Sequence, residues 1–209
     1  GLAQAIKGRG VRPFARLPFN DTIWIRRALD TGFAGLIIPL VNSAEEAARA
    51  VKVAKYPPQG ERGIGFAPAN DYGMKIDEAV ENANDRISVI AQVETAESVE
   101  NIESILDVVG IDGVFMGPYD LSGSYGILGQ FDHQLMKAAY DKVLKACRDR
   151  NKLAGIHVVP PSPDEVRRRI ELGFNFIALS LDITFISHGC RTLLAEAEKV
   201  KDSGCNVKS

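Results

Sequence analysis

Residues 87–116, ISVIAQVETAESVENIESILDVVGIDGVFM, contain two apolar runs separated by a stretch with helical spacing. The runs Ile87–Glu94 and Gly113–Met116 are rich in Val, Ile and Phe, as is typical of strands buried on both faces. Between them, the apolar residues of Val99–Leu106 recur at intervals of three or four, which indicates one face of a helix. The segment therefore predicts a strand–helix–strand unit with parallel strands.

The same alternation continues over the rest of the chain. Further strands are expected at Val11–Arg16, Gly35–Leu40, Leu153–Val159 and Phe174–Leu181, and further helices at Thr22–Asp30, from a Ser43–Glu46 capping box to about Lys55, at Leu135–Arg150, after Ser162 and at Thr184–Lys201. Six strands with helices between them predict a parallel sheet that is covered by helices. A doubly wound sheet and a (β/α)8 barrel both satisfy this pattern.

The start of the chain favours the barrel. No glycine-rich nucleotide-binding loop follows the first strand, which weakens the doubly wound alternative. Gly1–Lys7 has a helix-like pattern with no strand before it, and a TIM barrel needs eight strands. We therefore expect residues 1–209 to form a single α/β domain, a (β/α)8 TIM barrel that lacks its first two strands in this sequence.

One segment interrupts the rhythm of strands and helices. Tyr56–Met74 is long and rich in Gly and Pro, and connections of this length are often functional. It is either a surface excursion or a loop over the mouth of the barrel, and we favour the second interpretation.

Composition excludes several classes of protein. A net charge of −2 gives no basic excess for nucleic acid, and no apolar run approaches the roughly 20 residues of a membrane span. Cys147, Cys190 and Cys205 are odd in number and lack zinc-site spacing, which predicts reduced thiols in a cytoplasmic protein.

Polar residues follow several of the predicted strands, where a barrel carries its active site. Arg16, Gln92 and Glu94 end two strands, and Asp120 comes shortly after a third. A carboxylate in such a position is costly unless it is paired, and magnesium or manganese held by Glu94 and Asp120 would pair both. Arg16 suits an oxyanion. The alternatives are a helix N-cap for Asp120 and a salt bridge at the barrel rim for Arg16.

The residues between the fourth apolar run and Asp120 predict a binding turn. In Gly117-Pro118-Tyr119, the N–H groups of Gly117 and Tyr119 are placed to cradle a substrate carboxylate, with help from the hydroxyls of Ser122 and Ser124. The three histidines, His133, His157 and His188, show no metal-ligand spacing, and structural roles are favoured for all three.

These residues carry a family resemblance over essentially the whole chain. Val93-Glu94-Thr95, followed by Val114–Ser122 (Val-Phe-Met-Gly-Pro-Tyr-Asp-Leu-Ser), resembles the paired signature of the class II 2-oxo acid aldolases of the 4-hydroxy-2-oxoheptanedioate aldolase type, within the wider citrate lyase superfamily. Supporting matches are Phe14–Pro18, Ile38–Val41, Tyr56–Pro58 and Gly60–Gly63.

The resemblance implies a set of roles. Glu94 and Asp120 would be the ligands of a divalent cation (magnesium or manganese, with cobalt also possible), and Gln92 would line the metal site. Arg16 would hold the 2-oxo oxygen and stabilise an enolate, while the 117–119 main chain would hold the substrate carboxylate. Members of the family are (β/α)8 barrels that assemble as hexamers and often exchange the last helix between protomers.

The implied reaction forms or cleaves a carbon–carbon bond between pyruvate enolate and an aldehyde, as in the catabolism of aromatic compounds. No Lys ends a strand, so a Schiff-base route is disfavoured. The family also has two earlier strands and a Glu-His segment that acts in proton transfer, and this segment matches no residue here. We expect a truncated sequence rather than a degraded paralogue, and the general base stays unassigned.

Two alternatives remain. The first is an acyl-CoA lyase of the citrate lyase β or malyl-CoA lyase type, although no obvious basic cluster for the CoA phosphates is visible. The second is a catalytically inactive barrel.

Overall fold

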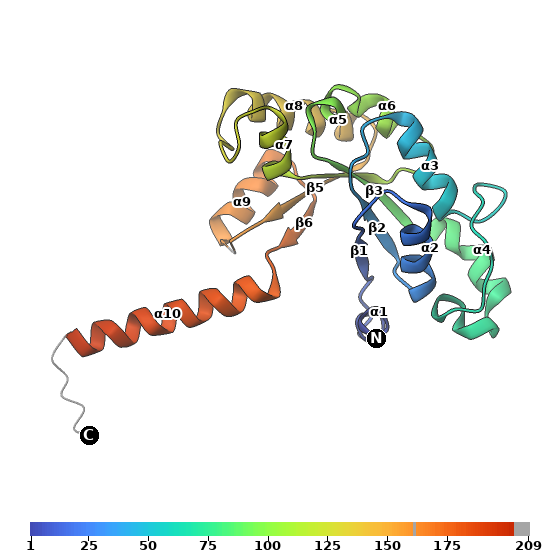
Figure 1. Ribbon diagram of the computed structural model, residues 1–209, viewed down its shortest axis with the longest axis horizontal. Helices are drawn as coiled ribbons and strands as arrows, with labels where there is room; N and C mark the ends of the chain where they lie inside the picture. Colours follow the sequence, from blue (N-terminus) through green and yellow to red (C-terminus); the bar gives the residue numbers. More distant parts are fainter. Residues whose placement is uncertain (161, 203–209) are drawn as a thin grey trace, which may run out of the picture.

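The structure is a computed structural model that describes residues 1–160 and 162–202, which form one curved parallel sheet with helices packed around it (Figure 1). The strands are β1 (Phe14–Arg16), β2 (Gly35–Ile38), β3 (Ser88–Val93), β4 (Gly113–Met116), β5 (Leu153–Val158) and β6 (Phe176–Leu179). They pair in the order β1-β2-β3-β4-β5-β6, and every pair is parallel. All the predicted strands are therefore confirmed, with shorter ends.

Helices follow the strands in alternation, as expected. They are α1 (Leu2–Lys7), α2 (Thr22–Thr31), α3 (Ala44–Ala54), the 3-10 helix η1 (Pro68–Gly73), α4 (Ile76–Arg86), α5 (Ala96–Glu100), α6 (Ile102–Leu106), α7 (Pro118–Ser124), α8 (Gln134–Asp149), α9 (Pro163–Leu172) and α10 (Asp182–Asp202). The predicted N-cap Ser43 accepts the Glu46 N–H, and the Glu46 carboxylate accepts the N–H of Asn42. This cap fixes where α3 begins after β2.

The two faces of the sheet bury different clusters. The outer face packs against the helices in a large apolar core. The inner face holds a smaller cluster built on Ile37, Ile90 and Phe115. Phe14 and Phe176 lie on the two edge strands of the sheet, yet their ring centroids are only 5.2 Å apart. The sheet therefore curls around its inner cluster as the wall of a TIM-type barrel does.

Glycines make room for the aromatic rings of the inner cluster. Gly155 lies between Phe115 and Phe176 in the register of β4, β5 and β6. A Cβ at this position would lie 2.5 Å from the Phe115 ring and 3.0 Å from the Phe176 ring. The inner wall thus alternates small and large residues across neighbouring strands.

We expect Gly155→Ala to lower the free energy of unfolding by about 1–3 kcal/mol, because the added methyl group forces two packed rings to move. Urea denaturation with a tryptophan fluorescence readout measures the change. Gly63→Ala is the matched control, since nothing lies within 4 Å of a Cβ built at Gly63. Equal stability of the two variants would contradict the packing argument.

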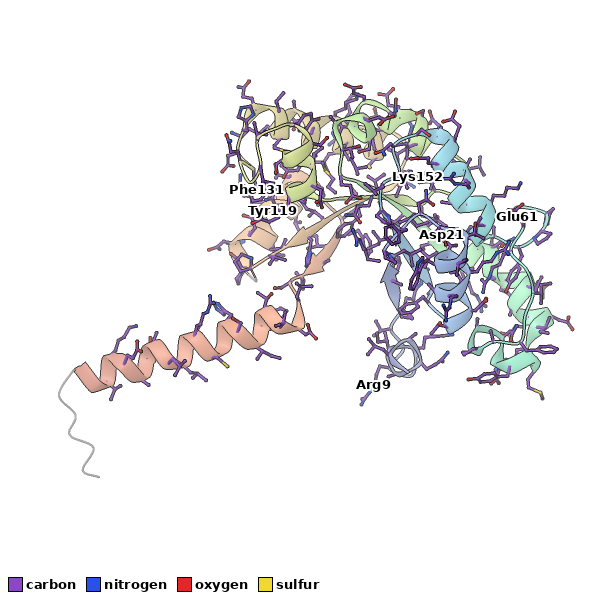
Figure 2. All side chains as sticks on the ribbon, viewed as in Figure 1. Arg9, Asp21, Glu61, Tyr119, Phe131 and Lys152 are labelled. Carbon is purple, nitrogen blue, oxygen red and sulfur yellow. The ribbon has the colours of Figure 1, made fainter. Side chains whose placement is uncertain are left out.

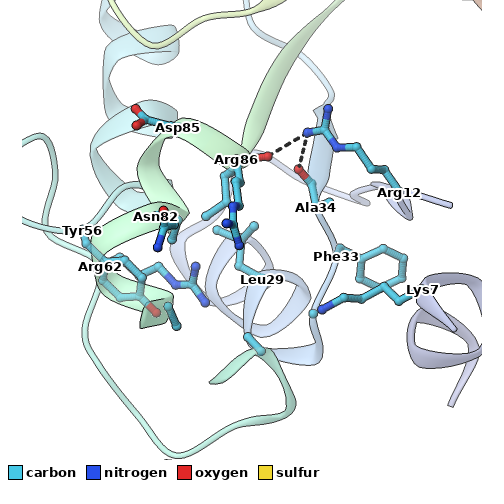
Figure 3. A pocket seen from close by; sticks show the side chains of 15 residues that line it. Lys7, Arg12, Leu29, Phe33, Ala34, Tyr56, Arg62, Asn82, Asp85 and Arg86 are labelled. Atoms are coloured by element: carbon cyan, nitrogen blue, oxygen red, sulfur yellow. Dashed lines mark hydrogen bonds between the residues drawn. The ribbon is translucent and has the colours of Figure 1, made fainter. Parts of the chain in front are cut away.

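The segment Tyr56–Met74 does not cover the mouth of the barrel, and that expectation was wrong. α3 runs back toward the amino ends of the strands, so the segment that follows it lies at the opposite end of the sheet. There Arg62 forms an ion pair with Asp30 at 2.7 Å, and its guanidinium group lies over the Tyr56 ring (Figure 3). The cavity beside it is also lined by Ala34 and Ile87, which precede β2 and β3.

The structure describes two of the three cysteines. Cys147 is buried in the outer core, and burial raises the pKa of its thiol to about 12. Cys190 is exposed on α10, and Cys205 lies outside the described residues. Among the helices of residues 1–160 and 162–202, none is long and apolar enough to cross a membrane.

Candidate active site

Three polar side chains, one on β1, one on β3 and one directly after β3, form a chain of hydrogen bonds at the carboxyl ends of the strands. Arg16 is the last residue of β1, and its Nε donates to Oε1 of Gln92 at 3.1 Å. The Gln92 amide donates in turn from Nε2 to Oε2 of Glu94 at 2.6 Å. Because Gln92 uses both ends of its amide, it fixes a cation and a carboxylate relative to each other.

Glu94 is a buried carboxylate with one main-chain donor. Its side chain is only 4% exposed, and Oε1 accepts the N–H of Leu40 at 2.8 Å. Leu40 has a left-handed φ of 53°, a conformation that is uncommon outside glycine. Burial raises the pKa of Glu94 and the charge of Asp120 raises it further, against the lowering effects of the Leu40 N–H and Arg16. The site thus holds a charge that lacks full compensation.

Asp120 lies in the first turn of α7, after β4. The N-cap of α7 is Gly117, so the interpretation of Asp120 as an N-cap was wrong. Among residues 1–160 and 162–202, no hydrogen-bond donor or cation partner is found for the Asp120 carboxylate. The side chain lines one pocket together with Arg16 and Glu94. The structure therefore brings together the three charged residues that the strand-end rule selected.

The alternative role for Arg16 is also unsupported. In the described part of the chain, no carboxylate lies within 4.0 Å of its guanidinium nitrogens, so Arg16 forms no salt bridge at the barrel rim. Its Nε is held by Gln92, and its side chain is exposed toward the pocket. The remaining guanidinium donors are therefore available to a ligand.

Only one of the two main-chain N–H groups of the predicted binding turn is free to bind a ligand. The Gly117 N–H donates to the Val93 carbonyl at 3.0 Å and continues the sheet, so it cannot bind a ligand as expected. The glycine at position 117 instead makes room for the Glu94 side chain, because a Cβ at Gly117 would lie 3.2 Å from Cβ of Glu94. Pro118 is the first residue of α7, where its missing N–H costs no hydrogen bond. The Tyr119 N–H is the member of the turn that remains for a ligand.

Ser122 does not face the pocket, and its predicted role in substrate binding is not supported. It is fully buried; its hydroxyl donates to the Tyr119 carbonyl at 2.8 Å and accepts the Gly129 N–H at 2.9 Å. Ser124 lines the pocket instead. The exposed ring of Tyr119 also lines it and packs edge-on against Phe131, with centroids 4.7 Å apart (Figure 2).

Comparison with known proteins shows the family of the chain. A model of the HpcH/HpaI aldolase/citrate lyase family matches residues 2–189. The chain belongs to the HpcH/HpaI aldolase/citrate lyase family. The expected barrel-type α/β fold and the expected enzyme class, a carbon–carbon lyase of the aldolase family, are therefore confirmed.

Individual HpcH/HpaI relatives are similar over most of their length. The chain is 37% identical over 193 residues to a 4-hydroxy-2-oxo-heptane-1,7-dioate aldolase of Shigella flexneri, covering 92% of this chain and 72% of that protein. It is 39% identical over 199 residues to the protein of the same name from Salmonella dublin, covering 94% and 75%. The crystal structure of a family protein from Burkholderia cenocepacia J2315 superposes with a TM-score of 0.87, at 32% identity over 93% of this chain and 77% of that one.

A solved structure of lower sequence identity shares the fold alone, and that protein was crystallised with a metal ion and a small oxo acid. The CitE protein of Mycobacterium tuberculosis, solved in complex with magnesium and acetoacetate, is 17% identical and has a TM-score of 0.54 over 80% of this chain and 62% of that one.

The side chains of the HpcH/HpaI pocket fit a hard divalent cation. Glu94 directly follows β3 and Asp120 lies in the first turn of α7 after the neighbouring strand β4, and each offers carboxylate oxygens and lacks a cationic partner within the described residues. No third His, Cys, Asp or Glu joins them in the part of the chain that the structure describes. Two carboxylates with water and substrate oxygens suit magnesium or manganese, whereas zinc prefers nitrogen and sulfur ligands.

Sequence reasoning missed some contacts of this site. The hydrogen bond from the Leu40 N–H to Glu94 depends on a left-handed φ at Leu40, and no sequence motif predicts this conformation. Of the three histidines, His133 caps α8 by accepting the Leu135 N–H, as a structural role requires. His188 lies in α10. His157 lies on the inner face of β5, where its Nε2 is 3.0 Å from the Ser180 carbonyl oxygen.

We predict a pH effect on the metal-free HpcH/HpaI protein from the raised pKa of Glu94. The native state binds this proton more tightly than the unfolded chain does, so the free energy of unfolding falls as the pH rises from the ordinary carboxyl value through the raised native value. Urea denaturation across this window measures the slope, with Glu94→Gln as the comparison. A slope that is unchanged in the variant would contradict the assignment of this titration to Glu94.

Proposed function

We propose that this chain is a divalent-metal-dependent class II aldolase that acts on 4-hydroxy-2-oxo acids, cleaving or forming the bond between pyruvate enolate and an aldehyde. The observation that carries the proposal is the chain Arg16–Gln92–Glu94, which ends beside the unpaired Asp120 in one pocket. A cation, an oriented amide and two carboxylates are the groups that binding and enolisation of a 2-oxo acid require. The names of the relatives from Shigella flexneri and Salmonella dublin support the same reaction.

Glu94 and Asp120 would hold the cation, with magnesium or manganese favoured and cobalt also compatible with the oxygen ligands. When bound, the ion supplies Lewis acidity toward the 2-oxo group of the substrate. Gln92 and the Leu40 N–H orient the Glu94 carboxylate toward the pocket. Hydrogen bonds of this kind commonly change metal affinity or activity by about 10- to 100-fold.

The other pocket residues act on the substrate itself. Arg16 donates to the 2-oxo oxygen and balances the negative charge that develops there when the enolate forms. The free Tyr119 N–H lies in the first turn of α7, where main-chain donors and the helix dipole favour a carboxylate. We assign the substrate carboxylate to this helix end and the aldehyde to the opposite side of the pocket.

Cleavage of 4-hydroxy-2-oxoheptanedioate tests the proposal, with pyruvate measured by a coupled lactate dehydrogenase assay. We expect activity that disappears with EDTA and returns with magnesium or manganese. Malyl-CoA and citryl-CoA serve as competing substrates, and faster cleavage of a CoA thioester would favour the acyl-CoA lyase alternative. Activity that survives chelation would refute the metal mechanism, and no activity on either class would favour an inactive barrel.

We place the reaction in the cytoplasm, in a pathway that breaks down aromatic compounds to 4-hydroxy-2-oxo acids. The free thiols Cys147 and Cys190 are consistent with a reducing compartment. The partners are then small molecules, a 2-oxo acid and an aldehyde.

We also propose a homo-oligomer, with a hexamer favoured by the family. α10 extends away from the sheet (Figure 1), and its large apolar side chains are exposed in the single chain. These side chains are Ile183, Phe185, Ile186, Leu193, Leu194 and Val200. An apolar surface of this kind marks a protein interface.

We expect Phe185→Asp to reduce the size of the assembly, because the charge would have to be buried in the interface of α10. Light scattering after size-exclusion chromatography measures the mass. The substitution Val109→Asp is the control, because Val109 is exposed in the loop between α6 and β4. A wild-type protein that is monomeric at micromolar concentration would contradict the proposal.

A further inference from the structure

Leu40 has a strained backbone conformation that would suit a smaller residue better. Its φ of 53° lies in the left-handed region, which costs a leucine energy that glycine or asparagine avoids. This conformation turns the Leu40 N–H toward Oε1 of Glu94, which accepts it at 2.8 Å. Any residue except proline supplies the same N–H, so the hydrogen bond explains the backbone but not the leucine side chain.

Packing in the core does not explain the leucine side chain either. Ile38 and Val41, which flank this turn, are fully buried in the outer core. Leu40 is 50% exposed and belongs to neither apolar cluster. Its side chain instead lines the active-site pocket beside Glu94. A strained and half-exposed leucine in a pocket is expected where the side chain contacts a ligand.

The position of Leu40 is set by the inner strands of the sheet. Leu40 follows β2, which pairs with β1 on one side and with β3 on the other. Glu94 directly follows β3, and the Leu40 side chain branches from the carbon next to the nitrogen that contacts Glu94. The Leu40 side chain therefore lies within one side-chain length of the Glu94 carboxylate.

Two prolines extend the apolar surface of Leu40. Pro39 precedes it, Pro18 follows β1, and both line the same pocket. These three side chains offer no hydrogen-bonding group, and the prolines have no N–H. In the strand order, β1 and β2 lie on one side of β3, while β4 and the helix α7 that follows it lie on the other. The side of the pocket away from α7 is therefore apolar.

The pocket offers no second cation to a substrate. Among the pocket-lining residues within 1–160 and 162–202, Arg16 is the one positively charged side chain, and it is assigned to the 2-oxo oxygen. Glu94 and Asp120 contribute two negative charges. With a divalent cation and the C1 carboxylate of the substrate bound, the charges of the pocket balance. A second carboxylate on the substrate would lie against the apolar side without a partner, which is costly.

The hydroxyl groups of the pocket are engaged by the loops around it. Thr95 Oγ1 donates to Oδ1 of Asn42 at 2.5 Å and accepts the Ser98 N–H at 3.0 Å. Ser124 Oγ accepts the Ala96 N–H at 2.9 Å. Neutral hydroxyls also bind a carboxylate less strongly than a guanidinium does. These groups therefore do not offset the cost of placing a second carboxylate in the pocket.

We propose that Leu40 selects the aldehyde half of the substrate, so that the protein prefers 4-hydroxy-2-oxo acids with an uncharged, apolar tail over those that end in a second carboxylate. This inference rests on the proposed function, because it assumes that the 2-oxo acid half is bound at Arg16, Glu94 and Asp120. The Leu40 side chain contacts the carbons beyond C4, while its N–H orients Glu94. The released product is then an aliphatic or aromatic aldehyde without a charge.

Two substrates of equal length test this preference. 4-Hydroxy-2-oxoheptanoate releases butanal and 4-hydroxy-2-oxoheptanedioate releases succinic semialdehyde, while both release pyruvate. We expect kcat/KM of the wild type, measured with magnesium, to be at least about 10-fold higher for the heptanoate. The ratio of the two kcat/KM values cancels any change in the Glu94 site that affects both substrates equally.

Variants of Leu40 should change this ratio in opposite ways from a structural defect. Leu40→Asn tolerates the left-handed φ but removes the apolar surface, so the ratio should fall by about 10-fold. Leu40→Lys supplies a cation to the second carboxylate, so the preference should reverse in favour of the heptanedioate. Leu135→Asn is the matched control, because Leu135 is 45% exposed in the first turn of α8 and lies outside the pocket. It should keep the wild-type ratio.

A second measurement does not depend on turnover. 2-Oxoheptanoate and 2-oxoheptanedioate lack the C4 hydroxyl group, so they are not cleaved. Calorimetric titration in the presence of magnesium should show that the wild type binds 2-oxoheptanoate more tightly, and that Leu40→Asn has lost this difference.

The inference about Leu40 is overturned if the wild type cleaves the heptanedioate as well as the heptanoate or better. It is also overturned if the Leu40 variants change both substrates by the same factor. A wild-type protein that cleaves neither substrate refutes the proposed function instead, and the affinities of the two analogues then decide the inference about Leu40. Binding of neither analogue refutes both.

Discussion

Replacing Glu94 by Gln is expected to abolish magnesium binding and to lower kcat/KM for aldol cleavage by at least about 100-fold, or about 2.7 kcal/mol of transition-state stabilisation. The substitution keeps the shape of the side chain but removes its negative charge. In the native protein, one Glu94 oxygen accepts from the Leu40 N–H and the other accepts from the Gln92 amide. In the variant, an amide NH2 group replaces one of these two oxygens. One donor must then face another, so the orientation of the side chain is lost together with its charge.

Calorimetric titration with magnesium and steady-state cleavage measure the two effects of Glu94→Gln separately. Glu97→Gln is the matched control, because Glu97 is an exposed carboxylate in the first turn of α5 and lies outside the pocket. It should bind magnesium and turn over as the wild type does. Retained magnesium affinity in Glu94→Gln would show that the cation, if one is used, is held elsewhere.

The barrel wall could be predicted because its physical signal is local. The central strands β2, β3 and β4 are short apolar runs that are buried on both faces, and helices such as α3 and α9 begin with a capping residue, Ser43 or Ser162. The position of the segment Tyr56–Met74 was predicted wrongly because its composition does not show in which direction the preceding helix, α3, runs. A connection from a helix back to a strand lies at the amino ends of a parallel sheet, far from the catalytic face.

Only part of the candidate site could likewise be predicted from the sequence. Arg16, Glu94 and Asp120 could be found because the carboxyl ends of parallel strands share one edge, so sequence position alone brings them together. The hydrogen-bonding state of Gly117 and Ser122 could not be found in this way. Their donors and acceptors are used by the sheet and by the loop after α7, which depends on register and loop geometry rather than on residue type.

The surroundings of His157 could not be predicted for a related reason. Its position in a strand left open whether it faced the inner cluster or the helices, and the neighbouring Ile156 and Val158 are buried on the outer side. Its Nε2 lies 3.0 Å from the carbonyl oxygen of Ser180, which is 23 residues away in the sequence. Only the pairing of β5 with β6 brings the two together.

Arg16→Ala is expected to lower kcat for cleavage by about 100- to 1,000-fold while magnesium affinity stays close to that of the wild type. Arg16 contacts Gln92, whereas the proposed ligands Glu94 and Asp120 remain in place. Arg16→Lys separates charge from geometry. Lysine keeps the positive charge but lacks the planar fork that donates to Gln92 and to a substrate oxygen at the same time, so only part of the activity should return.

Single-turnover cleavage and calorimetry on the same samples distinguish a loss of chemistry in the Arg16 variants from a loss of cation binding. Arg49→Ala is the control, because Arg49 is exposed on α3 and lies outside the pocket. If Arg16→Lys matches the wild type, charge alone is sufficient and the hydrogen bond to Gln92 has no catalytic role. If Arg16→Ala also matches, the enolate is stabilised without Arg16, and the chain of hydrogen bonds from β1 to β3 serves only to orient Glu94.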